Sequence, residues 1–123
     1  MAKIDDILMD VRNQLGTEFV SSDIVGMDGL PIASLALDPE FDSSAVAARL
    51  AMIMKLSTKV SAKLNIGTVE DNLITTDKVF ILIRFLGDGS YYWQVSVSKD
   101  ATLGVVRMLM AEYAEPLWTS ILQ

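Results

Sequence analysis

The apolar and polar positions of this chain repeat with a helical period in some stretches and with a period of two in others. From residue 3 to 15 the apolar positions recur every three or four residues, which is typical of one face of an amphipathic helix. These positions are Ile4, Ile7, Leu8, Val11 and Leu15. Gly16 follows them, and because glycine commonly stands just past the end of a helix, we expect this helix to end there.

Residues 18–36 predict a hairpin of two strands around the stretch DIVGMDGLPIAS, residues 23–34. Asp28 and Gly29 stand at its bend, where we expect a type I′ turn with a positive φ at both residues. Pro31 follows the bend and has no backbone N–H to donate. The second strand is therefore predicted to lie at an edge of the sheet.

A long helix is predicted from about residue 43 to 65, and Asp42, Ser43 or Ser44 can cap its first turn. One face has apolar residues at spacings of three and four, as a helix resting on a sheet requires. Its members are Val46, Leu50, Ile53, Val60 and Leu64, with Ser57 as the only polar one. The opposite side is also apolar, at Ala48, Met52 and Leu56. A helix with two apolar sides is buried on both, so we expect the second side to be covered as well.

Three stretches between residues 68 and 98 predict the strands of an antiparallel meander. VEDNLITT is a modest strand of polar character, KVFILIRFL is almost continuously apolar, and YYWQVSVS alternates strictly. Because KVFILIRFL is apolar on both sides, we expect it to be a central strand covered on both faces, with Arg84 as the exception. The sequence GDGS at residues 87–90 predicts the turn before the last strand.

A last helix is predicted from about residue 101 to 122, with Ser98 or Asp100 as its cap and a kink or local loosening at Pro116. The element order is therefore α-β-β-α-β-β-β-α. We predict one α+β domain over residues 1–123, in which a five-stranded antiparallel sheet lies between helical layers. The first and last helices are expected to share one face of the sheet, and the middle helix is expected to take the other.

The composition narrows the classes of function. The 123 residues carry a net charge of −6, which argues against a nucleic-acid partner because phosphate binding requires a basic surface. The chain contains no histidine, so it lacks the commonest general base and metal ligand, and neither an enzyme nor a cofactor is expected. No apolar run is long enough to span a membrane, and the lack of cysteine is compatible with a reducing cytoplasm. Apolar residues make up 51%, which indicates that another chain covers part of the surface.

Some polar residues resemble chemical sites, but each group has a simpler interpretation. Glu70, Asp71 and Asp77 do not have the spacing of a Ca²⁺ loop, and solvated charges on an edge strand explain them better. The serines have no histidine partner and no nucleophile-elbow motif, which favours structural roles. We therefore predict no metal site and no catalytic residue.

The lysine row at Lys55, Lys59 and Lys63 has two interpretations. A row at every fourth position is usually a solvated helix face. Here it alternates with Met52, Leu56 and small alanines in a chain that is acidic overall. A mixed basic and apolar helix face is typical of a partner surface, so partner binding is the favoured interpretation.

The stretches DIVGMDGLPIAS, KVFILIRFL, GDGSYYWQVSV and ATLGVVRMLM together resemble the roadblock (dynein light chain) domain family over about residues 4–115. The most specific parts are DGLPIAS at residues 28–34 and LGVVR at residues 103–107, and neither is catalytic. The resemblance implies a dimer in which the long middle helix and the third strand meet their counterparts, joining two five-stranded sheets. The interface residues expected on this basis are Ala48, Met52, Lys55, Leu56, Lys59, Lys63, Glu70, Asn72 and Ile74.

Members of the roadblock family serve as platforms or regulators of small Ras-like GTPases and as assembly subunits of dynein, and bacterial relatives activate a polarity GTPase. The resemblance therefore implies a non-enzymatic cytoplasmic module that forms a homodimer or heterodimer and engages a Ras-like GTPase. One alternative is a dimerisation scaffold whose binding ignores nucleotide state. Another is a small-molecule sensor, which requires a sizeable internal pocket lined by Tyr92 or Trp118.

Overall fold

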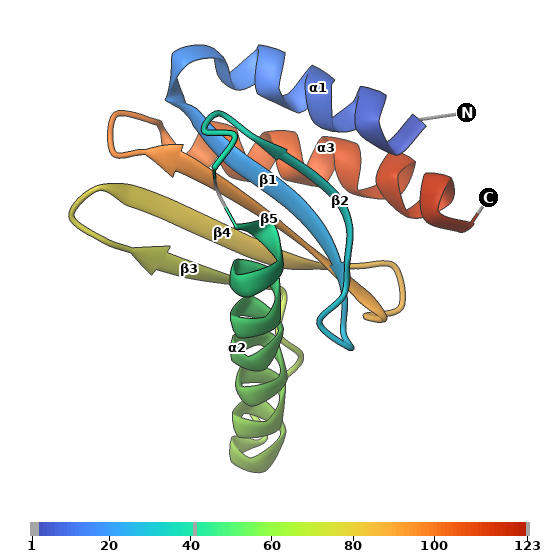
Figure 1. The fold of residues 1–123 in the computed structure, drawn as a ribbon. Helices are drawn as coiled ribbons and strands as arrows, with labels where there is room; N and C mark the ends of the chain where they lie inside the picture. Colours follow the sequence, from blue (N-terminus) through green and yellow to red (C-terminus); the bar gives the residue numbers. More distant parts are fainter. Residues whose placement is uncertain (1–2, 41, 123) are drawn as a thin grey trace.

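The computed structural model describes residues 3–40 and 42–122, and Figure 1 shows their arrangement. The elements follow the predicted order. They are α1 (Lys3–Leu15), a short 3-10 turn (Gly16–Glu18), β1 (Phe19–Gly26), β2 (Pro31–Ala36), α2 (Ser43–Leu64), β3 (Asp71–Thr75), β4 (Val79–Leu86), β5 (Tyr91–Ser98) and α3 (Leu103–Leu122). The predicted α+β class and element order are thereby confirmed.

The five strands form one antiparallel sheet in the order β2-β1-β5-β4-β3. Pro31 begins β2, and this strand lies at one edge of the sheet as its missing N–H predicts. β3 forms the other edge. β4 lies between β5 and the edge strand β3, so it is an interior strand as expected, but it is only half-buried at several positions, and the middle position belongs to β5.

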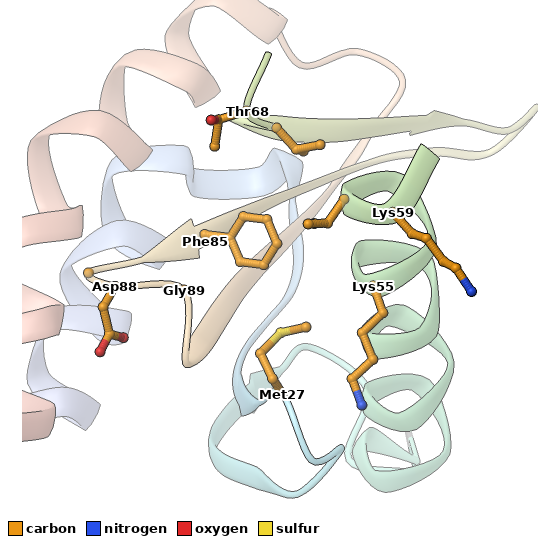
Figure 2. Close-up of a pocket in the computed structure, with 10 residues that line it drawn as sticks. Met27, Lys55, Lys59, Thr68, Phe85, Asp88 and Gly89 are labelled. Atoms are coloured by element: carbon orange, nitrogen blue, oxygen red, sulfur yellow. The ribbon is translucent and has the colours of Figure 1, made fainter. Parts of the chain in front are cut away.

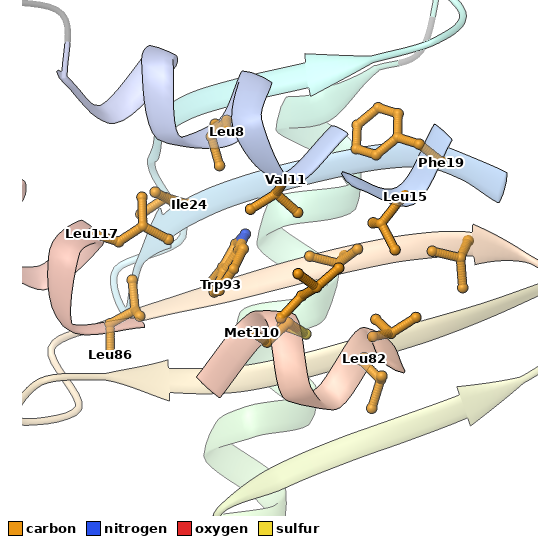
Figure 3. Packing of buried hydrophobic residues seen from close by; sticks show 14 residues of the cluster. Leu8, Val11, Leu15, Phe19, Ile24, Leu82, Leu86, Trp93, Met110 and Leu117 are labelled. Carbon is orange, nitrogen blue, oxygen red and sulfur yellow. The ribbon is translucent and has the colours of Figure 1, made fainter. Parts of the chain in front are cut away.

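α1 and α3 lie side by side on one face of the sheet, and α2 crosses the other face alone (Figure 1). This is the predicted layering. Figure 3 shows the larger core, in which Val11 of α1 and Met110 of α3 pack over Trp93 of β5. Trp93 is fully buried, and its indole N–H donates to the hydroxyl of Ser22 at 2.8 Å, so the ring fills the core without an unpaired polar atom.

The face of α2 that rests on the sheet differs from the predicted one. The buried residues are Ala47, Leu50, Ala51 and Met54, whereas Val60 and Leu64 are exposed. The reason is the direction of the helix, which crosses the strands and continues past β3, so that only its first half has a sheet beneath it (Figure 1). Asp42 caps the start of α2, and its side chain accepts from the backbone N–H of Ala45 at 3.2 Å, as expected.

The turn between β1 and β2 is not the predicted type I′ turn. The strands end at Gly26 and begin again at Pro31, so four residues connect them instead of two. Gly29 has a φ of +90°, but Asp28 is not among the described residues with positive φ. The Asp28 carboxylate accepts from the backbone N–H of Leu30 at 3.1 Å, a local bond that favours this wider turn.

The start of the last helix also differs from the prediction. α3 begins at Leu103, and the backbone N–H groups of Val105 and Val106 donate to the carbonyl of Thr102. Neither Ser98 nor Asp100 therefore occupies the cap position, because the turn after β5 delays the helix. α3 continues through Pro116 to Leu122, and the kink expected at the proline stays a prediction. None of the helices in the described part of the chain is long and apolar enough to cross a membrane.

Candidate interaction surface

The outer side of α2 presents an apolar stripe that no part of the described chain covers. Met52 and Leu56 expose 69% and 63% of their surface, as the prediction of a second apolar side requires. Val60 and Leu64 continue the same row at intervals of four residues and are also exposed. We call Met52, Leu56, Val60 and Leu64 the α2 stripe. Ala48, at the head of this row, is exposed as well.

Val60 and Leu64 are interface candidates that the sequence analysis assigned to the core instead. Their spacing satisfies both assignments, since a residue at every fourth position drifts slowly around a helix. The position of the sheet edge decides between them. Because β3 is the last strand, the residues of α2 beyond it have no sheet to rest on.

The three lysines of the predicted surface all lie on α2 and are exposed: Lys55, Lys59 and Lys63. Within residues 3–40 and 42–122, the ion pair that forms joins Arg107 and Asp71, so these ammonium groups have no carboxylate partner there. The row therefore places positive charge beside the α2 stripe. Lysine side chains beside exposed apolar residues are suited to the polar rim of an interface.

The strand residues of the predicted surface divide into two kinds. Glu70 precedes β3 and is exposed, whereas Asn72 and Ile74 point toward α2. The hydroxyl of Ser57 donates to the side-chain oxygen of Asn72 at 3.1 Å, and Ile74 packs against the core beneath α2. These two half-buried residues therefore help to hold α2 against the sheet edge.

The edge strand itself remains open. β3 pairs with β4 on one side and has no strand neighbour on the other within the described chain. A groove of about 500 Å³ lies between it and α2 and is lined by Leu56, Ser57, Val60, Ser61, Val69, Asp71 and Asn72. An unpaired edge beside an apolar groove is a surface onto which another chain can add a strand.

A second pocket of about 580 Å³ lies where the second half of α2 faces the turns at the end of the sheet (Figure 2). Met27 and Phe85 point into the space between the sheet and α2, and Lys59 points away from it (Figure 2). Neither Tyr92 nor Trp118 lines this pocket. Trp118 packs against Tyr91 with ring centroids 6.2 Å apart. This pocket is therefore not the internal pocket lined by Tyr92 or Trp118 that the sensor alternative requires.

Tyr92 is fully buried beneath α2, and its hydroxyl donates to the backbone carbonyl of Ala47. Burial, and secondly the nearby Asp23 carboxylate, raise the pKa of Tyr92 well above 10.0. Asp23 is itself buried and accepts a 2.6 Å hydrogen bond from the side-chain amide of Gln94. The open question of whether Tyr92 binds a ligand is thereby resolved in favour of core packing, since its one polar atom ties α2 to the sheet.

This raised pKa gives a prediction for stability. Tyrosine in an unfolded chain loses its proton near pH 10, whereas folded Tyr92 keeps its proton there. Because the folded state then binds more protons than the unfolded state, the free energy of unfolding falls as the pH rises above about 10. Tyr92→Phe should cost about 1 kcal/mol at pH 7 through the lost hydrogen bond and should make the fall above pH 10 shallower. Urea unfolding at pH 7, 10 and 11 measures both, with Tyr113→Phe as the control. An unchanged slope in Tyr92→Phe would contradict the assignment.

The acidic residues weighed as a metal site do not come together. No group of three or more His, Cys, Asp or Glu side chains in the described part of the chain is arranged to hold a metal ion. Asp71 instead pairs with Arg107, at 3.4 Å. The arrangement therefore offers surfaces for binding other chains, and the geometry around the carboxylates suggests no chemistry.

Comparisons with known proteins were made by sequence and by structure. No protein-family model matches the chain, and no curated protein matches it by sequence. A roadblock/LC7 domain from Streptomyces avermitilis superposes on it with a TM-score of 0.86 at 18% identity, over 97% of this chain and 98% of that one. MglB of Myxococcus xanthus superposes with a TM-score of 0.88 at 14% identity, over 97% and 94% of the two chains.

The chain has the roadblock fold. A structure described as MglB with a tetrameric arrangement gives the same result, with a TM-score of 0.85 at 13% identity over 96% of this chain and 87% of that one. The resemblance inferred from the hairpin and the last helix is thus confirmed at the level of the fold. In this roadblock fold, the α2 stripe and the outer edge of β3 lie next to each other, and no described part of the chain covers either of them.

Proposed function

We propose that this protein is a non-enzymatic, dimeric regulator or platform for a small Ras-like GTPase in the cytoplasm. The observation that carries the proposal is the two-sided α2, which is buried against the sheet on one side and carries the exposed α2 stripe on the other. Sequence features typical of the roadblock family support the GTPase as partner. The exposed lysines beside the stripe support a protein surface as the binding target.

The dimer is proposed to form through α2 and β3. Two copies related by a two-fold axis would bring the same surface of each together, so that each α2 stripe is covered by its counterpart. Pairing of the two β3 edges would satisfy the unpaired backbone groups and extend the sheet across both chains. Covering Met52 and Leu56 removes large apolar side chains from water, which is the main driving force for such association.

GTPase regulation is proposed to work by selection of one nucleotide state. A surface that binds the GTP-loaded and GDP-loaded forms with different affinities shifts the partner toward the form it prefers. Typical coupling of this kind changes affinity by about 5- to 150-fold. The chain lacks histidine, so we propose that the hydrolytic residues are those of the GTPase.

The test is the binding of a Ras-like GTPase from the same genome, loaded with GDP or with a non-hydrolysable GTP analogue. We expect at least about a fivefold difference in affinity between the two states. The double variant Lys55→Glu/Lys59→Glu should weaken the tighter interaction, whereas Lys3→Glu on the opposite helical layer should not. Equal affinity for both states, with no change in hydrolysis rate, would contradict regulation and favour the scaffold.

A further inference from the structure

The pocket of about 580 Å³ between α2 and the turns at the end of the sheet lies on the side of α2 that the proposed dimer leaves open (Figure 2). We call it the α2–turn pocket. The residues of α2 that line it are Lys55, Thr58 and Lys59. The groove beside β3 is instead lined by Leu56, Ser57, Val60 and Ser61. Because these two sets of residues alternate along the helix, the pocket and the groove lie on different sides of it.

The floor of the α2–turn pocket is apolar and is held in place by the fold. Met27 and Phe85 point into the space between the sheet and α2 (Figure 2), and both also pack against the core beneath α2. The backbone N–H of Met27 donates to the carbonyl of Ser90 at 3.0 Å, which joins the turn after β1 to the turn before β5. The floor is therefore formed before any partner binds, as in most binding sites.

The charge around this pocket is positive, although the chain as a whole carries a net charge of −6. Residues 43–69 contain no Asp or Glu and four cationic side chains, at Arg49, Lys55, Lys59 and Lys63. The one carboxylate in the pocket lining belongs to Asp88, which points away from α2 (Figure 2) and accepts from the hydroxyl of Ser90 at 2.6 Å. An apolar floor beside lysines that no described carboxylate pairs with is complementary to a ligand that is both apolar and acidic.

The spacing of the lysines indicates the shape of this ligand. Lys55 and Lys59 are four residues apart on a helix, which separates them by about 6 Å along its axis. In an extended chain, side chains on the same side recur every second residue, after about 6.6 Å. Carboxylates at alternate residues of an extended segment beside α2 therefore match the two lysines. The side chains between them point the opposite way, toward Met27 and Phe85.

We propose that the α2–turn pocket binds an extended segment of a partner protein in which acidic and apolar side chains alternate. The carboxylates pair with Lys55 and Lys59, and an apolar side chain enters the space between Met27 and Phe85. A protein segment fits better than a small molecule, because Lys59 points away from the pocket (Figure 2) and only a ligand that extends beyond it reaches both lysines. This inference goes beyond the GTPase, since it requires neither a nucleotide state nor the dimer.

The direct test is a ¹H–¹⁵N NMR titration of the protein with the synthetic peptide GSDFELDGS. We expect a dissociation constant below about 1 mM and saturable shifts confined to the backbone amides around the pocket, at residues 27, 55–59, 68–69 and 85–89. The peptide GSDDEFLGS has the same composition without the alternation and should bind about fivefold or more weakly, and the charge-reversed GSKFKLKGS should bind about tenfold or more weakly. Equal binding of the three peptides, no saturable shift, or shifts elsewhere on the protein would overturn the proposal.

Two variants test the two parts of the site. Lys55→Glu should weaken binding of GSDFELDGS by about tenfold, whereas Lys78→Glu makes the same change in the turn between β3 and β4 and should have no effect. Thr58→Trp places a large ring in the pocket from an exposed helix position and should also weaken binding by about tenfold or more. Urea unfolding confirms that each variant is folded, and unchanged binding by folded Thr58→Trp would contradict the pocket.

Phenylacetate, titrated alone, separates a protein segment from a small ligand. It carries one ring and one carboxylate, so it fits the pocket but reaches only one lysine, and we expect it to bind at least about fivefold more weakly than GSDFELDGS. If it binds as tightly as the peptide, the pocket is a small-molecule site and the proposed segment is wrong. None of these probes contains a GTPase, so a failure of the GTPase proposal would leave their result unchanged.

Discussion

Replacing Met52 by glutamate is expected to convert the proposed dimer into a monomer. In the proposed interface the two copies of residue 52 lie within the contact between the α2 helices, so each dimer would bury two unpaired carboxylates. Burying one charge without a partner costs about 3–5 kcal/mol, so two such sites raise the dissociation constant by about ten-thousandfold or more. Light scattering and sedimentation at micromolar concentration measure the mass directly. Leu56→Glu, one turn further along the α2 stripe, should act in the same way.

The control for this experiment is Met9→Glu. Met9 is also an exposed methionine on a helix, but it lies on α1, in the layer on the other side of the sheet. Met9→Glu introduces the same charge in place of the same residue type, and it should leave the mass of the protein in solution unchanged. A protein that remains dimeric with Met52→Glu, or that becomes monomeric with Met9→Glu, would show that the α2 stripe is not the interface.

Replacing Gly87 by alanine is expected to lower the free energy of unfolding by about 2–4 kcal/mol. Gly87 begins the turn between β4 and β5 with a φ of +56°, a conformation that disfavours alanine. A Cβ at this position would also lie 2.2 Å from the ring of Trp118, so the indole would have to move away from its place against Tyr91. Denaturant unfolding monitored by tryptophan fluorescence measures the loss and reports on Trp118 at the same time.

Gly89 in the same turn provides the matched control. Its φ of +88° is also positive, but a Cβ there would meet only Phe85, at an ordinary contact distance of 3.9 Å. Gly89→Ala should therefore show the backbone cost alone, about 1–2 kcal/mol. In a Trp118→Ala background the extra cost of Gly87→Ala should disappear. If the two glycine variants lose the same stability, the close approach of Trp118 is not what requires Gly87.

The roadblock fold follows closely from local patterns in this sequence. The apolar spacing of α1 needs no partner to be recognised, because a helix shows its period within two turns. Pro31 placed β2 at an edge through a property of one residue, its missing N–H. The predicted type I′ turn was wrong. Asp-Gly is common in two-residue loops and also stands in the observed four-residue loop. The hydrogen bond from the backbone N–H of Leu30 to the Asp28 carboxylate favours the longer loop.

The candidate surface was only partly predictable. Met52 and Leu56 could be predicted as surface residues because they lie opposite the core face of α2, wherever the edge of the sheet lies. Val60 and Leu64 were assigned to the core, because their period is equally that of a buried face. Asn72 is an interface candidate from the sequence, and in the structure its side chain also accepts a hydrogen bond from Ser57 at the edge of the groove. These outcomes depend on where α2 crosses the edge of the sheet.

The sequence by itself determined the elements, their order, the two-layer helical arrangement and the two-sided character of α2, since each of these is written in spacings of a few residues. Only the tertiary structure decided which strand lies in the middle, how far α2 extends past β3, and which residues of α2 rest on the sheet. The physical reason is that these features arise from contacts between residues distant in the chain. A local pattern shows which side of an element is apolar, but it does not show what that side will meet.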